Sequence, residues 1–376
     1  MNELTDQQTE FLNRYGFDAE LFHGWQSAVA EGRMSQAGNV VTDELLAPPP
    51  GSIAKVPPSS SEAFAELREL GRAAIRRGEL GVVVLNGGMA TRFGGVVKGV
   101  VPVLGQDRSF LALAIEDALG IQRECGGGRI GIFLMNSFAT DEATKAHLEA
   151  HENFGADSAQ VTCFTQFVSL RMQKDGAVFH LESGDVSPYG PGHGDFAPAF
   201  RQSGMLQRFL DGGGKYVLVR NVDNLGARVD PVVLGHHIKA GREATFEVAP
   251  KWPEDVGGSP YLYGGRTQLI EQVRYPAGFD PNIVDVFNTN TAWFTAGALD
   301  RDFDLGWYYV EKKVEGRTAV QVEHLIGEMT AHLSTSFLQI RRSGRETRFL
   351  PIKTPEDLDG ARDEIAEMYD GAGEDG

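Results

Sequence analysis

Short, fully apolar runs recur along the middle of the chain and predict buried strands. The runs are Gly81–Leu85, Ile130–Leu134 and Tyr216–Arg220. Helix-like stretches lie between and beside them, at about 109–124, 140–151 and 201–211. Strands that alternate with helices indicate an α/β fold with a mostly parallel sheet flanked by helices. Ligands in such folds bind at the carboxyl ends of the strands.

The segments on either side of this core have different patterns. The first 45 or so residues predict one or two short helices, and the proline-rich stretch Pro48–Ser61 predicts a linker without regular structure. Capping-box spacing at Ser59–Glu62 and helical apolar intervals predict an amphipathic helix that ends near Gly78. A β-rich portion follows at about 245–340, with strand patterns at 246–249 and 286–294. The end of the chain predicts a short acidic helix and a mobile tail.

These patterns divide the chain into three parts. Residues 1–60 form a helical segment and linker, residues 61–358 form the main domain, and residues 359–376 form the acidic helix and tail. The length of 376 residues also fits two domains, or one large α/β unit with appendages.

Charge narrows the range of partners. The chain has 35 basic and 52 acidic side chains and a formal charge of −17, so its overall field repels the phosphates of a nucleic acid. We therefore expect no nucleic-acid partner. A bound phosphate must be attracted by local backbone N–H groups, a helix N-terminus, placed Lys or Arg residues, or a metal ion.

Cysteine content and hydropathy indicate the compartment. Cys125 and Cys163 are too few for a disulfide framework and lack metal-binding spacing. The first ten residues carry acidic groups where a signal peptide needs basic and then apolar residues, and no apolar run approaches 18 residues. We expect a cytoplasmic protein without a membrane partner.

A glycine-rich loop follows the first buried strand. Asn86–Gly95 reads NGGMATRFGG, and Lys98 comes three residues later. Glycines here let main-chain N–H groups reach phosphate oxygens, and Arg92 and Lys98 add fixed positive charge. The loop is neither a Walker A motif nor a dinucleotide fingerprint. A structural turn with two surface cations is the alternative interpretation.

Polar residues follow the later strands too. Gln166 comes after the run 161–165 and could read a base with its amide, although ordinary core packing is the alternative. His193 lies between glycines in GPGHGD, where it could hydrogen-bond a phosphate or sugar hydroxyl, or act as a general base. Asp223 follows the third strand and suits Mg²⁺ that bridges phosphates, with an Asn/Asp turn cap as the alternative.

Eight motifs in chain order resemble those of the UTP–glucose-1-phosphate uridylyltransferase family, the eukaryotic-type UDP-sugar pyrophosphorylases. The motifs are NGGMATRFGG with Lys98, LMNSFATDEAT, the Gln166 segment, GPGHGD, RNVDNLGARVD, FEVAPKWPEDVGG, FNTNTAWF and FLPIKTPEDL. The resemblance covers about residues 81–358. It implies a glycosyltransferase-A-like nucleotidyltransferase fold with a mixed, mostly parallel sheet, preceded by the helical N-terminal segment. Many relatives carry a C-terminal β-helix domain, which we expect this chain to lack because it ends shortly after Lys353.

The resemblance also implies the reaction and the site. UTP and glucose 1-phosphate would give UDP-glucose and pyrophosphate with Mg²⁺ as cofactor. The implied catalytic residues are Lys98, Arg92, His193 and Lys353; the implied nucleotide-binding residues are Leu85, Asn86, Gly87, Gly88, Met135, Gln166 and Gly192; the implied sugar-binding residues are Asn221, Gly258, Glu271 and Asn288; and the implied metal ligand is Asp223. The sugar phosphate is already an anion at neutral pH, so we expect electrostatic and orienting roles rather than a covalent nucleophile.

Two departures from the family pattern leave alternatives open. Ala90 replaces a glycine of the usual GGLGT loop, and VVKG at 96–99 replaces the usual proline–lysine pair. A pyrophosphorylase for N-acetylglucosamine or galactose 1-phosphate, a nucleotide-sugar glycosyltransferase and a catalytically silent sensor remain alternatives. The oligomeric state stays open. The cluster Arg341, Arg342, Arg345 and Arg348 is expected to be a solvated edge, with subunit contact or phosphate attraction as the alternative.

Overall fold

The computed structural model describes residues 4–370, without the side chains of Ala90 and Thr91. The tail expected at 371–376 and the side chain that distinguishes Ala90 from glycine therefore lie outside the described part. No helix within the described residues is both long enough and apolar enough to span a bilayer.

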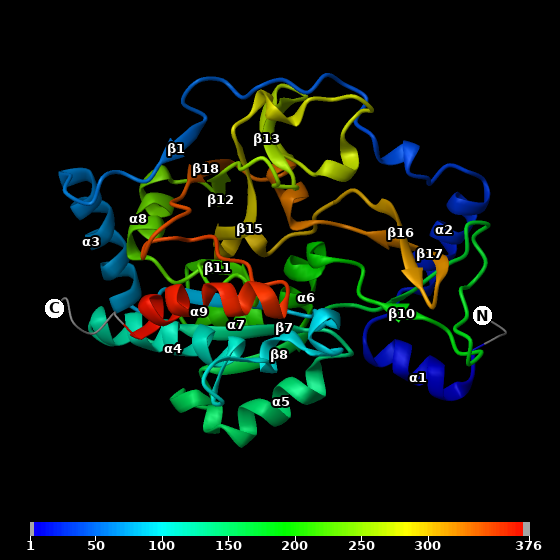
Figure 1. The fold of residues 1–376 in the computed structure, drawn as a ribbon, viewed down its shortest axis with the longest axis horizontal. Coiled ribbons are helices and arrows are strands. Elements are labelled where there is room, and N and C mark those ends of the chain that lie inside the picture. The colour runs from blue at the N-terminus through cyan, green and yellow to red at the C-terminus, as the bar shows by residue number, and fades with distance from the viewer. Residues whose placement is uncertain (1–3, 371–376) are drawn as a thin grey trace.

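Eight strands form one central sheet (Figure 1) in the order β1-β18-β12-β15-β11-β2-β7-β8. The strands are β1 Ile53–Lys55, β18 Thr335–Gln339, β12 Ala244–Pro250, β15 Val286–Thr295, β11 Tyr216–Asn221, β2 Leu80–Asn86, β7 Gly131–Asn136 and β8 Val161–Thr165. Neighbours run parallel except at β15, which is antiparallel to both β12 and β11. The mixed, mostly parallel sheet predicted from the sequence is confirmed.

Helices cover both faces of this sheet. These helices are α3 Glu62–Arg76, α4 Phe110–Glu124, α5 Asp141–Ala150, α6 Phe196–Gln202, α7 Met205–Asp211, α8 Pro231–Ala240 and α9 Pro355–Asp370. The first two helices, α1 Asp6–Arg14 and α2 Ala19–Ala30, pack elsewhere. Val82 and Val84 of β2 pack with α3, α4, α8 and α9, whereas Val83 and Leu85 pack with α6 and α7. Because alternate residues of a strand point to opposite faces and both faces are covered, β2 is apolar from Leu80 to Leu85.

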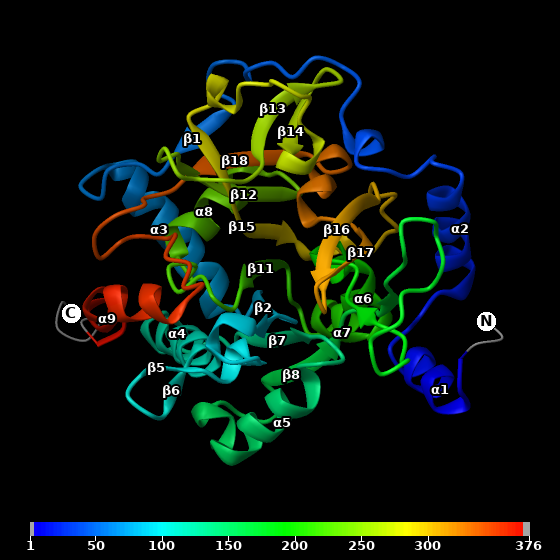
Figure 2. The same ribbon diagram turned by 45° about the vertical axis from the view of Figure 1, so that its right-hand side comes forward.

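Short hairpins and bridges surround the sheet. They are β3 Met89–Ala90 with β4 Val96–Val97, β5 Pro102–Leu104 with β6 Arg108–Ser109, β9 Ser169–Leu170 with β10 Pro188–Tyr189, β13 Ser259–Tyr263 with β14 Arg266–Ile270, and β16 Tyr308–Val314 with β17 Arg317–Glu323. Figure 2 shows α1 and α2 at the right-hand edge of the molecule, on the same side as the β16–β17 hairpin. Trp25 of α2 packs there in a separate apolar cluster with Tyr309 and Val320.

Three local expectations need correction. Ile53–Lys55 in the proline-rich stretch is a strand, because it pairs in parallel with the edge of β18 and satisfies backbone groups there. Ser61, not Ser59, caps α3, since its hydroxyl accepts a hydrogen bond from the N–H of Phe64 at 3.1 Å. The helix expected at 201–211 is divided between α6 and α7 by Gly204, whose φ is +74°.

Candidate functional site

A pocket of about 490 Å³ lies at the carboxyl ends of β2, β7 and β11. Its wall consists of Leu85, Gly87, Gly88, Met89, Arg92, Lys98, Met135, Gln166, Gly190, Gly192, His193, Asn221, Val222, Asp223 and Lys353. All but four of the predicted site residues are in this set. The pocket therefore lies where α/β sheets bind their ligands.

Charges that are not paired with one another line the pocket, and one of them, Lys98, is buried. Lys98 is only 6% exposed, and its ammonium lies 3.9 Å from the ring centre of Phe93 and 4.9 Å from that of Phe110. Burial lowers the pKa of Lys98, and burial raises the pKa of Asp223 against the opposing effect of Lys98 and Lys353. Among the described ion pairs, none joins Asp223 to either lysine. The pocket thus presents both signs of charge to a ligand.

The His193 loop needs its glycines because it packs closely on His324. Gly194 donates its N–H to the carbonyl of His324 at 3.0 Å, and a Cβ at this position would lie 2.8 Å from the imidazole of His324. Gly192 has a φ of +105°, and a Cβ there would overlap the carbonyl oxygen of His324. His324 in turn contacts the Asp195 carboxylate at 2.6 Å. The backbone and the imidazole of His324 therefore both hold the loop in place.

The tautomer of His193 follows from one backbone contact. The N–H of Ile326 donates to His193 Nδ1 at 3.0 Å, so this nitrogen carries no proton. Burial, with a smaller effect of His324, lowers the pKa of His193 to about 4. The imidazole is neutral at pH 7, and its proton is on Nε2. Of the two roles considered from the sequence, this geometry favours hydrogen-bond donation over general-base catalysis.

The predicted base-reading residues come together at one end of the pocket. Gln166 is fixed by its own N–H, which donates to the carbonyl of Asn136 at 2.8 Å. Its amide leaves no space for side chains beside it: a Cβ at Gly87 would lie 3.1 Å from Nε2, and a Cβ at Gly190 would overlap the amide. Apolar Leu85 and Met135 line the same pocket. An amide edge between apolar walls suits a planar base.

Asn86 is the one predicted nucleotide-binding residue outside the pocket wall. Its side chain is fully buried, and Nδ2 donates to Asn136 Oδ1 and Thr144 Oγ1, both at 2.8 Å. These contacts connect the ends of β2 and β7 to α5. In this structure the side chain supports the loop from behind.

The other three predicted residues outside the pocket form a neighbouring cluster. Asn288 donates its N–H to the carbonyl of Gly258 at 2.8 Å and its Nδ2 to Glu271 Oε1 at 3.2 Å. Burial raises the pKa of Glu271. Asn290 connects this cluster to the pocket, because its N–H donates to Asn288 Oδ1 and its Nδ2 donates to Asn221 Oδ1, both at 3.0 Å.

Sequence reasoning missed Asn290, together with Gly190, Met89 and Val222 of the pocket wall. Asn290 has a φ of +58°, a conformation that asparagine adopts more readily than most residues. The repeated asparagines of FNTNTAWF were the available signal.

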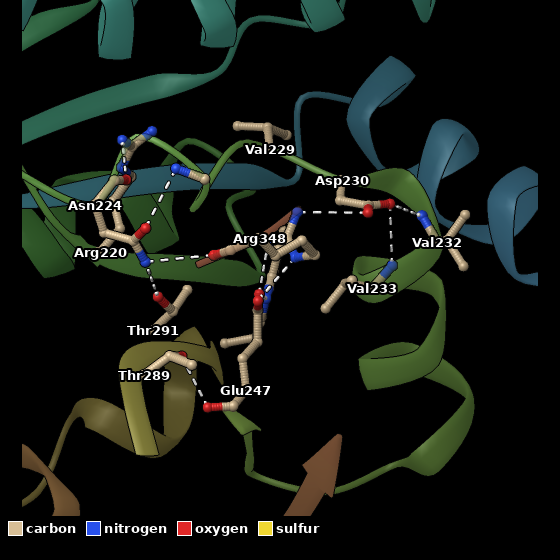
Figure 3. Close-up of polar contacts among 12 residues, drawn as sticks. Arg220, Asn224, Val229, Asp230, Val232, Val233, Glu247, Thr289, Thr291 and Arg348 are labelled. Atoms are coloured by element: carbon tan, nitrogen blue, oxygen red, sulfur yellow. Dashed lines mark hydrogen bonds and ion pairs between the residues drawn. The ribbon is translucent and has the colours of Figure 1, made fainter. Parts of the chain in front are cut away.

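A buried polar network holds the segment that brings Lys353 to the pocket (Figure 3). Arg348 donates Nε to Glu247 Oε2 at 2.8 Å and Nη2 to Oε1 at 2.6 Å, and it lies 3.4 Å from Asp230. Beyond it, Ile352 donates its N–H to the carbonyl of Asp223 at 2.9 Å. Lys353 follows directly, so the network places it beside Asp223.

This network corrects the expectation of a solvated basic cluster. Arg348 is 6% exposed, and Arg342 pairs with Asp255 and stacks on Trp252 with its guanidinium 3.7 Å from the ring centre. Only Arg341 and Arg345 remain near the surface. Two of the four arginines are interior because distant carboxylates compensate for their burial.

The donor set fits Mg²⁺ that is held jointly with a substrate. The described residues contain no group of three or more His, Cys, Asp or Glu side chains that could hold a metal ion by themselves. Asp223 is a single carboxylate in a phosphate-sized pocket with two lysines. Magnesium is commonly held by one or two carboxylates together with substrate phosphates and water.

A mostly parallel α/β sheet with lysines, a carboxylate and glycine backbone at its carboxyl edge suits the binding of a phosphate-containing nucleotide. The sequence agrees: residues 49–371 match the family described as UTP–glucose-1-phosphate uridylyltransferase. The chain belongs to this family of nucleotidyltransferases, as the motifs indicated.

Named relatives and solved structures agree with this assignment. UTP–glucose-1-phosphate uridylyltransferase of Hordeum vulgare is 30% identical over 350 residues, which is 88% of this chain and 68% of the relative. The enzyme of the same name from Solanum tuberosum is 32% identical over 297 residues, 74% of this chain and 60% of the relative. The chain thus matches about two thirds of the length of these relatives.

Solved structures of two kinds share the fold. UDP-glucose pyrophosphorylase of Leishmania major, a V402W mutant, superposes with a TM-score of 0.69 at 23% identity and covers 90% of this chain and 73% of its own. Uridine diphosphate N-acetylglucosamine pyrophosphorylase of Trypanosoma brucei gives 0.76 at 18% identity, with coverage of 89% and 75%. The fold is therefore common to pyrophosphorylases named for different sugars.

Proposed function

We propose that this protein is a uridylyltransferase that forms UDP-glucose and pyrophosphate from UTP and glucose 1-phosphate in a Mg²⁺-dependent reaction. The observation that supports the proposal most is the pocket in which buried Lys98 and exposed Lys353 lie near Asp223 without forming an ion pair with it. The names of relatives that are 30–32% identical support glucose as the sugar.

UTP would bind along the loop after β2. Leu85 and Met135 would pack on uracil, and the Gln166 amide would hydrogen-bond its edge. The backbone at Gly87 and Gly88 would approach the phosphates, where no side chain intervenes. Lys98, with exposed Arg92 at the rim, would neutralise the triphosphate.

The transfer would be an in-line displacement at the α-phosphorus. A phosphate oxygen of glucose 1-phosphate would form the new P–O bond while the bond to pyrophosphate breaks, with no proton to remove from the nucleophile. His193 would donate its Nε2 proton in a hydrogen bond to a phosphate oxygen, and Lys353 would hold the phosphate from the far side. Asp223 would hold Mg²⁺, which supplies neutralisation of charge on the reacting phosphates.

Glucose would bind towards the Asn288 cluster. Glu271, Asn288 and the Gly258 backbone would meet the sugar hydroxyls, and Asn221 would lie between sugar and phosphates. Because hydroxyl recognition depends on each donor and acceptor being matched, this cluster would determine which sugar is accepted.

Pyrophosphate release from the purified protein tests the proposal. UTP and Mg²⁺ are supplied with glucose, galactose or N-acetylglucosamine 1-phosphate, and the other nucleoside triphosphates and chelated metal serve as controls. We expect release with UTP and glucose 1-phosphate that stops when the metal is chelated.

Other outcomes identify the alternatives. Release only with another sugar phosphate would replace glucose by that sugar. Sugar transfer from UDP-glucose to an acceptor would indicate a glycosyltransferase. Calorimetric binding of UDP-glucose without any turnover would indicate a sensor and contradict the enzymatic proposal.

A further inference from the structure

Another cavity, lined by arginines and aromatic rings, lies at the opposite end of the same strands. It has a volume of about 430 Å³ and is lined by the turns that precede β2, β7 and β11 and by α7. β2 has seven residues, so at about 3.3 Å per residue the cavity lies on the order of 20 Å from the pocket at the other end. The two hollows share no lining residue.

The wall of this cavity is positively charged, although the chain as a whole is negatively charged. It contains Arg76, Arg77, Arg129 and Arg208 but no aspartate or glutamate. The whole chain has 52 acidic and 35 basic side chains. A local excess of guanidinium groups in such a molecule attracts anions that the remaining surface repels.

Most of the donors on these arginines remain available. Arg77 and Arg129 each form an ion pair through one nitrogen, with Glu79 at 2.7 Å and Asp157 at 2.6 Å, and their side chains are 57% and 52% exposed. A guanidinium has five N–H donors, so each arginine keeps others for a ligand. The Arg129–Asp157 pair is exposed on both sides and contributes about 1 kcal/mol or less, whereas the Glu79 side chain that binds Arg77 is only 7% exposed. Arg208 has no hydrogen bond or ion pair through its side chain within residues 4–370. An anion can therefore bind the guanidinium groups of Arg129 and Arg208 with little loss of existing contacts.

Helix ends account for part of the cluster. Arg76 lies in the last turn of α3 and donates Nε to the carbonyl of Cys125 at 3.0 Å, and Arg208 lies in the last turn of α7. Cations there interact favourably with the helix dipole. Arg77 is the C-cap residue of α3, so the same effect applies to it, but it does not explain Arg129, which lies in the irregular segment before β7. Nor does it explain Thr162 in the cavity wall, whose buried hydroxyl has no hydrogen-bond partner in the described part of the chain.

The cavity also has an aromatic floor. The rings of Phe133 and Phe209 meet edge to face with centroids 5.7 Å apart. A Cβ at Gly131 would lie 3.0 Å from Phe133, and a Cβ at Gly214 would overlap Phe209. These glycines leave the rings in place and the space above them open. The ligand that fits has a phosphate for the arginines and an apolar or planar part for the rings.

We infer that this cavity is a binding site for a small phosphate monoester, separate from the pocket of the proposed reaction. Phosphate oxygens would receive bonds from Arg129 and Arg208, and the organic part would lie on Phe133 and Phe209. A nucleoside monophosphate and a sugar phosphate share this chemistry.

Calorimetric titration with adenosine 5′-monophosphate and with glucose 6-phosphate tests the inference, with inorganic phosphate as a third probe. We expect at least one monoester to bind to the wild-type protein, and to bind at least tenfold more weakly to Arg129→Ala/Arg208→Ala. Its affinity should remain within twofold in Lys98→Ala, which changes the other pocket. Preference for the nucleotide would indicate base stacking, and preference for the sugar phosphate would indicate hydroxyl recognition.

A control variant that removes two arginines elsewhere separates the effect of contacts in the cavity from the effect of the protein's net charge. Arg14→Ala/Arg33→Ala removes two exposed, paired arginines elsewhere and should leave the affinity unchanged. The arginine variants should keep the thermal midpoint, because the ion pairs of Arg14, Arg33 and Arg129 are exposed. The inference is overturned if no probe binds at 5 mM, if the cavity variant binds like wild type, or if Lys98→Ala alone abolishes binding.

Discussion

Two buried charged regions of this protein differ in how their charges are matched. In the network around Glu247 and Arg348, two hydrogen bonds join the pair, and Trp293 donates a third to Glu247 at 2.8 Å. In the pocket, buried Lys98 and half-buried Asp223 have no ion pair between them.

The pKa shifts follow this difference. Burial alone would lower the pKa of Arg348, but the facing carboxylates of Glu247 and Asp230 raise it. Burial prevails in the pocket, where it lowers the pKa of Lys98 and raises that of Asp223. Matched charges hold the fold together, and unmatched charges remain available to a ligand.

Replacing one partner of the matched pair should have the largest effect. Arg348→Met leaves the Glu247 carboxylate buried without its partner, and such changes destabilise proteins by about 3–5 kcal/mol. Urea unfolding should show this loss of unfolding free energy. Glu247→Leu/Arg348→Met should recover much of it, because no lone charge remains. A change below 1 kcal/mol in the single variant would contradict the role assigned to the network.

Removing a charge from the unmatched region should affect activity rather than stability. We expect Lys98→Ala to lower kcat by about 10²–10³-fold, the range found when one group that stabilises the transition state is lost. Unfolding free energy should not fall, because burial of this ammonium is unfavourable. Lys239→Ala, at an exposed lysine paired with Glu66, is the control and should keep full turnover. Turnover of Lys98→Ala near the wild-type value would remove the lysine from the proposed mechanism.

Lowering the pH from 6.5 to 4 should reduce the unfolding free energy through the buried, neutral histidines. Burial lowers the pKa of His193 and of His237 to about 4, whereas an unfolded histidine titrates near 6.5. Between these values the unfolded state binds protons that the native state does not. Stability is therefore complete above about pH 6.5 and falls towards pH 4, by up to about 1.4 kcal/mol per pH unit for each histidine.

The variant His237→Gln measures this contribution. Its unfolding free energy should depend less steeply on pH than that of wild type between pH 6.5 and 4, because one of the two titrations is removed. Subtraction of the two curves cancels the shared contribution of the carboxylates. Identical slopes would show that His237 is protonated in the native state.

We expect the smallest effect on unfolding free energy from an ion pair that is exposed to solvent. Arg14 and Glu142 are 3.2 Å apart, but their side chains are 62% and 75% exposed. Arg14→Ala should therefore change the unfolding free energy by less than about 1 kcal/mol, and added salt should reduce the difference. A loss as large as that of Arg348→Met would mean that burial is not what separates the two pairs.

Local pattern predicted much of the fold and most of the pocket. The buried strands β2, β7 and β11 were visible as apolar runs, and the residues that follow them line the pocket. Glycines marked the places where His324 and Gln166 approach the backbone. These features are encoded by neighbours in the chain, so a sequence read in short windows shows them.

Partners far apart in the chain were not predicted. β1 was missed because its reason to be extended is the free edge of β18, almost 300 residues later. Arg348 looked like a surface residue because its compensating carboxylate is on β12, and Asn290 looked ordinary until its contacts with Asn221 and Asn288 were known.

The sequence by itself therefore determined the class of fold, the carboxyl-edge location of the pocket and the residue types in it. Tertiary structure decided which charges are neutralised and which are left for a ligand, how Lys353 reaches Asp223, and which nitrogen of His193 carries its proton. The physical reason is that periodicity and glycine positions act locally, whereas burial and charge compensation depend on what the folded chain brings together.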